Sequence, residues 1–193
     1  MGRSAPMLQT ARSVILCVKS AELPFVIDAD GLCVVERDPE LIRGYDKVIL
    51  TPNAVEFERL CSSVKIQDTK TPDAVNALAK ALGNVVIVRK GETDVISNGH
   101  GVTWTCDHPG SVRRVGGQGD ILSGAIGTFM AWSNMKHTAT KEPVENGSLL
   151  AAYAGCMLTR ECSRRAFEQH GRSMLTSDML EHIGPSFRAL FEQ

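Results

Sequence analysis

The segment Gly116-Gly117-Gln118-Gly119-Asp120, just ahead of a long apolar helical stretch, has the residue types needed to handle a phosphoryl group. Glycines before a helix let the backbone approach a ligand, and the amides of a helix N-terminus attract anions. Asp120, in the first turn, could accept a proton from an attacking hydroxyl. The alternative is a glycine-rich helix start in which Asp120 only caps the helix. The segment matches neither the Walker A nor the Rossmann pattern.

Asn53 and Glu56 form a second candidate pair, because their spacing places them on one face in the first turn of a helix predicted from Asn53 to Cys61. Their oxygens could hold a hydrated Mg²⁺ or orient a phosphate through bound water. Asn and Glu at this spacing also resemble a helix-capping box. The two roles are compatible, so both stay open.

Three further charged residues follow apolar runs typical of buried strands. Lys90 comes directly after one run and could neutralise nucleotide phosphates, although a solvated lysine is the alternative. Asp28 and Asp30 end another run, where they could meet substrate hydroxyls or metal-bound water, or serve only as turn acids. The metal ligand is left open, with Glu56 or Asp30 acting through water as the candidates.

The elements that would position these residues alternate between helical and strand periods. We expect strands at 24–28, 47–51 and 85–89, separated by helices at 8–20, 38–45, 53–61 and 74–82. Strands that alternate with helices predict parallel pairing through crossover connections. Ligands bind beyond the carboxyl ends of parallel strands, so the polar segments that follow each strand are expected to meet at one edge.

The second half of the chain changes pattern. Asn98-Gly99 is a strong turn signal between Asp94–Ser97 and Gly101–Thr105, and predicts an antiparallel hairpin. Three helices are expected after it, at 121–134, 148–164 and 176–191. At roughly 100–200 residues per domain, residues 1–193 make a single α/β layered domain.

Composition excludes several classes of function. The net charge of −1 gives no broad attraction for nucleic acid, and the longest uncharged stretch, Ile121–Met135, is shorter than the roughly 20 residues of a membrane span. The six cysteines form no C-x-x-C pair, and the histidines lack ligand spacing, so we expect free thiols rather than a metal cluster. The N-terminal residues suit an amphipathic helix better than a targeting segment.

Four motifs, in this order, resemble the ATP-dependent NAD(P)H-hydrate dehydratase family of the ribokinase-like superfamily. They are Val26-Ile-Asp-Ala-Asp-Gly-Leu32, Leu50-Thr-Pro-Asn-Ala-Val-Glu-Phe57, Val88-Arg-Lys-Gly-Glu92 and Gly116-Gly-Gln-Gly-Asp-Ile-Leu-Ser-Gly124. His170–Ser173 and Ser177–Met179 also fit the C-terminal region of the family. The sequences of the motifs are most similar to those of its animal form. The resemblance implies a three-layer α/β/α fold with a mainly parallel central sheet, from which the family's N-terminal strands would be missing.

The resemblance also implies an activity. Members of the family are hydro-lyases that act in metabolite repair. They convert the hydrated cofactors NADHX and NADPHX back to NADH and NADPH, using ATP and Mg²⁺. The implied course is phosphoryl transfer to the hydrate hydroxyl, followed by elimination of phosphate.

Roles carried over by motif make Asp120 the base and a substrate contact, and give Gly117 and Gly119 the amides of an anion hole. The implied substrate-binding residues are Asn53, Ala54, Val55, Glu56, Phe57, Glu58 and Arg59. The implied ATP-binding residues are Lys90, Gly91, Glu92, Thr93, Asp94, Gly110, Ser111, Val112, Arg113, Arg114, Val115, Gly116, Gly117, Gln118 and Gly119.

The family usually has a substantial segment before the position of Ala11, and Met1–Pro6 does not match it. Missing strands would expose sheet edge and core, which favours aggregation or instability. We expect ATP binding to survive, because its motifs lie in the retained part of the family's sequence, and we expect full activity less. The alternatives are a ribokinase-like kinase of a vitamin alcohol and a catalytically impaired nucleotide-binding isoform. The resemblance further implies a functional link to the NAD(P)HX epimerase, allows a homo-oligomer, and points to mitochondria or cytoplasm, with no contact to nucleic acid or membrane.

Overall fold

The computed structural model describes residues 4–71, 73–140 and 146–192. Its α-helices are α1 Ala5–Ser20, α2 Leu32–Arg37, α3 Ala54–Ser63, α4 Asp73–Ala81, α5 Gln118–Thr140, α6 Gly147–His170, α7 Thr176–Glu181 and α8 Ile183–Phe191. Its strands are β1 Phe25–Ile27, β2 Val48–Leu50, β3 Val86–Arg89, β4 Asp94–Ser97 and β5 Thr103–Cys106. Short 3₁₀ helices lie at Ala29–Gly31, Pro39–Leu41 and Gly171–Ser173.

The five strands form one sheet in the order β1-β2-β3-β4-β5. The first three strands pair in parallel, as predicted, with Ile27 opposite Leu50 and Leu50 opposite Ile87. β4 and β5 extend the sheet as an antiparallel hairpin, in which Asp94 lies opposite Cys106. The hairpin predicted from Asn98-Gly99 is therefore confirmed, and the sheet is mixed.

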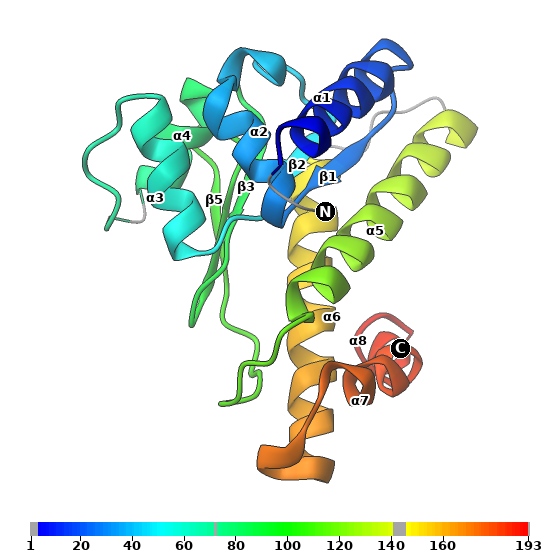
Figure 1. Ribbon diagram of the computed structural model, residues 1–193. Helices are drawn as coiled ribbons and strands as arrows, with labels where there is room; N and C mark the ends of the chain where they lie inside the picture. Colours follow the sequence, from blue (N-terminus) through cyan, green and yellow to red (C-terminus); the bar gives the residue numbers. More distant parts are fainter. Residues whose placement is uncertain (1–3, 72, 141–145, 193) are drawn as a thin grey trace.

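Helices cover both faces of the sheet, which gives the three layers seen in Figure 1. Alternating side chains of the buried strands point to opposite faces. Leu50 and Ile87 pack into a core shared with α1 to α4, whereas Ile49 and Val88 pack against α5 and α6. The α/β layered domain predicted from the alternating periods, and the three-layer α/β/α fold that the family resemblance implies, are both confirmed.

Two predicted helices are wrong in their bounds. The polar stretch 38–45 was expected to be helical, but it contains only the 3₁₀ helix Pro39–Leu41, since Gly44 has a φ of +70° that an α-helix does not allow; the α-helix of this region lies earlier, at α2. The single helix expected at 176–191 is two, α7 and α8. Pro185 has no N–H to give to the Glu181 carbonyl, so α7 ends at Glu181 and a new helix starts at Ile183, with Pro185 in its first turn, where no N–H is needed.

The topology brings several chain segments to one edge of the sheet. β1, β2 and β3 end there, and β4 begins there because it runs antiparallel to β3. β5 ends at the same edge, so the connection that follows it delivers the start of α5 to the three carboxyl ends. No helix in the described part of the chain combines the length and apolar character that crossing a membrane requires.

Candidate active site at the carboxyl edge of the sheet

Asp28, Thr51 and Lys90 each follow a parallel strand, and they meet in space. The Lys90 ammonium lies 2.8 Å from Asp28 Oδ1, and the Thr51 hydroxyl donates to the same oxygen at 2.8 Å. Both side chains of the ion pair are largely buried, since the side chain of Lys90 is 21% exposed and that of Asp28 is 13% exposed. The strand ends therefore present a fixed cation and a fixed carboxylate side by side.

The start of α5 packs directly onto this pair. A Cβ atom built on Gly119 would lie 3.1 Å from Asp28 Oδ2 and 3.5 Å from Lys90 Nζ, so only a glycine lets the helix come this close without displacing a neighbour. Gly117 has a φ of +92°, a conformation that side chains disfavour. The first amides of an α-helix have no acceptor within the helix, and they carry partial positive charge. The lysine and the helix start together make a positively charged corner.

Asp120 follows Gly119 in the first turn of α5, and its side chain is exposed. It is not turned into the core, and it is one residue away from Gly119, which lines the cavity described below, although Asp120 itself is not part of that lining. Its role as the base stays a prediction. Its amide donates to the Gly117 carbonyl at 3.0 Å, a bond across three residues that closes the first turn of the helix, and the Ile121 amide donates to the same carbonyl at 3.2 Å.

A cavity of about 530 Å³ opens next to this corner. Its walls come from the loops after β3 and β5, the start of α5, and one face of α6. The lining residues are Lys90, Gly91, Glu92, Asp94, Gly110, Ser111, Val112, Arg114, Gln118, Gly119, Leu122, Cys156, Thr159, Arg160 and Ser163.

Two separate stretches of predicted ATP-binding residues, 90–94 and 110–119, thus meet around one cavity. Five residues from these stretches are not part of its lining: Thr93, Arg113, Val115, Gly116 and Gly117. The Arg113 guanidinium is instead used by the fold, since its Nε donates to the Met174 carbonyl at 3.1 Å. The Gly116 carbonyl accepts a hydrogen bond from the Thr176 hydroxyl, which anchors the loop to the start of α7.

The predicted substrate-binding stretch 53–59 lies at the start of α3, outside the lining of this cavity. Asn53 and Glu56 form the capping box that was left open above: Asn53 Oδ1 accepts from the Glu56 amide at 3.0 Å, and Glu56 Oε2 accepts from the Asn53 amide at 2.8 Å. Phe57 is 1% exposed and packs in the core, so its side chain does not face a ligand.

Residues of the stretch 156–163 of α6 also line the cavity, and they were not predicted from the sequence. Thr159 and Arg160 lie three and four residues after Cys156, and Ser163 lies four and three residues after them, so one helix face carries all four. That spacing of small and polar residues within an apolar helix was a readable signal. What the sequence could not show is that this face turns toward the loops after β3 and β5.

The cavity suits a nucleotide with phosphates. Lys90, Arg114 and the start of α5 supply positive charge, while the backbone of two loops supplies polar groups without bulk. Mg²⁺ fits as a hydrated ion held mainly by phosphate oxygens, because it needs few protein ligands. Among the described residues, no group of three or more His, Cys, Asp or Glu side chains is placed to hold a metal alone.

Asp30, the other metal candidate, lies in the 3₁₀ helix after β1 and does not line the cavity. A role for Asp30 or Glu56 through water stays a prediction.

Comparisons with solved structures identify the fold. The chain superimposes on a ribokinase-like superfamily protein from Enterococcus faecalis with a TM-score of 0.70, 18% identity, and coverage of 98% of this chain and 60% of that one. It also matches the ADP/ATP-dependent NAD(P)H-hydrate dehydratase of Bacillus subtilis, co-crystallised with ATP and Mg²⁺, with a TM-score of 0.63, 23% identity, and coverage of 86% and 55%. The predicted ribokinase-like fold class is confirmed.

Sequence comparisons give the family. The ATP-dependent (S)-NAD(P)H-hydrate dehydratases of Bos taurus and Homo sapiens are 44% and 43% identical to the whole of this chain. The chain spans only 59% and 56% of the lengths of those two relatives. The sequence model of the family described as NAD(P)H-hydrate dehydratase matches residues 5–185. The chain therefore belongs to the NAD(P)H-hydrate dehydratase family.

Proposed function

We propose that this chain carries the nucleotide site and the catalytic base of an ATP-dependent NAD(P)H-hydrate dehydratase, acting on NADHX and NADPHX. The observation that supports this most is the packing of Gly119 against the Lys90–Asp28 pair at the mouth of one cavity. A cation, a helix N-terminus and an adjacent exposed carboxylate are the groups that phosphoryl transfer to a hydroxyl needs. The relatives that match the whole chain have this activity in their names.

Each part of the site would have a distinct task. Lys90 and the first amides of α5 hold negative charge, because they form the positively charged corner of the cavity. Asp120 takes the proton from the hydrate hydroxyl as that oxygen attacks. When bound, ATP supplies the phosphoryl group that turns a poor hydroxyl leaving group into a phosphate.

The elimination that follows needs little from the protein. The carbon–oxygen bond breaks with help from the ring-nitrogen lone pair, phosphate leaves, and the neighbouring ring carbon loses a proton. The departing phosphate takes up the ring-carbon proton, and the hydroxyl proton passes from Asp120 to solvent. The sum is one hydrate and one ATP giving one reduced nicotinamide cofactor, one ADP, one phosphate and one proton.

The test is a turnover assay with purified chain, Mg²⁺, ATP and NADHX or NADPHX, read by the returning dihydronicotinamide absorbance and by released phosphate. Both products should appear in equal amounts, and neither should appear without ATP. A stable phosphorylated product with no cofactor recovery would instead indicate a small-molecule kinase. ATP binding with no turnover of either hydrate would reduce the chain to a nucleotide-binding protein.

The remaining expectations stay predictions: a functional link to the NAD(P)HX epimerase, a homo-oligomeric state, and location in mitochondria or cytoplasm. The family membership supports the first of them, because an epimerase would supply the hydrate epimer that the relatives' names specify. Size-exclusion chromatography with light scattering decides the second.

A further inference from the structure

Arg160 is the most heavily bonded side chain of the cavity wall. It reaches from α6 across to the loop after β3, where its Nε donates to Asp94 Oδ2 at 2.7 Å. Its Nη2 donates to the carbonyls of Gly91 and Glu92, at 3.2 and 2.8 Å. Its Nη1 donates to the His108 carbonyl in the loop after β5, at 3.3 Å. One guanidinium therefore holds both loops that wall the cavity.

These bonds leave Arg160 little capacity for a ligand. A guanidinium has five N–H donors, and all three of its nitrogens are already engaged here. The ion pair is also satisfied on its other side, because Asp94 Oδ1 accepts from the Gly91 amide at 3.0 Å. The side chains of Arg160 and Asp94 are only 15% and 10% exposed, which strengthens the pair.

The residues beside Arg160 on α6 bind the second loop as well. Ser163 Oγ accepts from the Ser111 amide at 3.1 Å and donates to the Arg160 carbonyl at 2.8 Å. A Cβ atom on Gly110 would lie 3.4 Å from Ser163 Oγ and 3.6 Å from Arg160 Cγ, so the loop backbone rests on both side chains. Two residues of α6 thus hold the loop at His108, Gly110 and Ser111.

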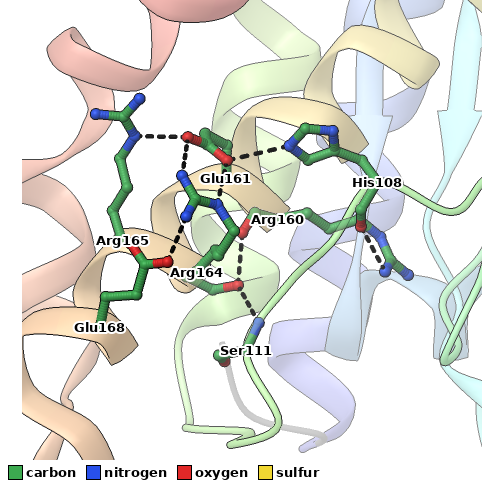
Figure 2. A network of polar contacts seen from close by, with 8 residues as sticks. His108, Ser111, Arg160, Glu161, Arg164, Arg165 and Glu168 are labelled. Carbon is green, nitrogen blue, oxygen red and sulfur yellow. Dashed lines mark hydrogen bonds and ion pairs between the residues drawn. The ribbon is translucent and has the colours of Figure 1, made fainter.

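Glu161 adds a further tie on the neighbouring face of α6, drawn in Figure 2. Its carboxylate lies 3.1 Å from His108 Nε2, and it accepts hydrogen bonds from Arg164 and Arg165. His108 is therefore held by its ring through Glu161 and by its carbonyl through Arg160. Four consecutive positions of α6, 160 to 163, include three residues that bind the loop after β5.

We propose that Arg160 is a positioning residue: it holds the two loops of the nucleotide cavity in their binding geometry before the nucleotide arrives, and does not itself contact phosphate. The inference rests on the proposed ATP site in the same cavity. Loops that are ordered in advance save the binding free energy otherwise spent on ordering them. An arginine in such a wall would ordinarily be assigned to phosphate binding, and the geometry points elsewhere.

The first test is amide hydrogen exchange of the ligand-free chain, which does not depend on ATP binding. Arg160→Lys keeps the charge but cannot reach three carbonyls at once. We expect amides in 91–94 and 108–111 to exchange about tenfold faster in this variant, while β2 and β3 are unchanged. Arg172→Lys, the same change at an exposed arginine just after α6, is the matched control and should leave both loops unchanged.

Asp94→Asn is the second variant, which keeps side-chain shape and removes the charge that Arg160 binds. It should loosen the same two loops, and combining it with Arg160→Lys should add little, because both changes break one interaction. If Arg160→Lys exchanges faster throughout the sheet, the variant is unfolding and Asp94→Asn decides the question.

Calorimetry separates positioning from phosphate binding. Arg160→Lys should weaken Mg-ATP and adenosine by the same factor, about tenfold, because a loosened wall affects the whole nucleotide. Weaker ATP binding with unchanged adenosine binding and unchanged loop exchange would overturn the proposal and make Arg160 a phosphate ligand. If the wild-type chain binds no ATP but the exchange effect is present, the proposed function fails and the positioning role stands.

Discussion

Asp120 is the residue on which the proposed chemistry depends most. Asp120 is exposed and follows Gly119, where a Cβ atom would lie 3.1 Å from Asp28 Oδ2. Asp120→Asn removes the base while keeping the size of the side chain. We expect turnover to fall at least about 10²-fold, the lower range for a positioned base, with little change in ATP affinity. Steady-state kinetics and calorimetry check the two parts, and an Asn variant with near-normal turnover would exclude Asp120 as the base.

Gly119 tests the close approach of α5 to the strand ends. Gly119→Ala places a methyl group 3.1 Å from Asp28 Oδ2, tighter than ordinary contact, so the helix start or the ion pair must shift. We expect ATP affinity to fall about tenfold or more, since phosphate donors must be held closely to act. Gly124→Ala is the control on the same helix, because nothing lies within 4 Å of its Cβ position. Equal ATP affinity in both variants would show that the α5 start does not bind phosphate.

The sequence predicted individual site residues best where a residue directly follows a strand. Asp28, Lys90 and Gly119 were singled out from their positions after apolar runs or before a helix, and they meet in space. Arg160 was missed, because its role depends on two loops reaching α6 across the sheet edge, a relation that no local pattern contains.

The packing of α5 against α6 fixes one wall of the cavity. A Cβ atom on Gly155 of α6 would overlap the Ile126 side chain and approach the Ile126 backbone nitrogen at 3.2 Å. Gly155→Ala should therefore destabilise the fold by about 1–3 kcal/mol through overpacking. The free energy of unfolding in urea measures this effect.

Gly127→Ala on α5 is the matched control, since its Cβ position has nothing within 4 Å. It should be neutral or stabilising by about 0.5–1 kcal/mol, because alanine favours the helix. If both alanine variants are equally stable, the two helices do not pack as closely as described.

Strands were the elements best predicted from sequence, since continuous apolar runs such as 85–89 are typical of strands covered on both faces. Helices were less certain. The stretch at 38–45 buries Leu41 and Ile42 but forms only the 3₁₀ helix Pro39–Leu41, and Gly44 has a φ of +70° that no α-helix allows, whereas α2 is short and buries Leu32 and Val35. Local propensity gives way to burial in such cases.

Glu161 contributes to the stability of the folded protein toward acid. Hydrogen bonds from Arg164 lower the pKa of Glu161 from 4.5 to about 2 against the opposing effect of burial, and Arg165 and His108 act in the same direction. A depressed pKa means that the unfolded chain binds the proton more readily. The stabilisation is therefore complete above about pH 5 and is lost as the pH falls from there toward about 2.

Glu161→Gln removes this dependence. At neutral pH the variant should be less stable by about 2 kcal/mol, the range for hydrogen bonds to a charged group. Its stability should also change less than that of the wild type between pH 5 and 2. Urea denaturation at several pH values measures both effects, and a Gln variant with the same acid sensitivity as the wild type would contradict the role of Glu161. Glu168→Gln, a change at an exposed partner of Arg164, is the control.

The proposed activity of the molecule depends on where the phosphates of ATP bind. The most direct measurement is a crystal structure of the chain with Mg²⁺ and a non-hydrolysable ATP analogue. We predict that the terminal phosphates lie on the first amides of α5 and within hydrogen-bond distance of the Lys90 ammonium, with the two loops in the positions that Arg160 gives them. Phosphates bound elsewhere in the cavity, away from both Lys90 and the start of α5, would contradict the account.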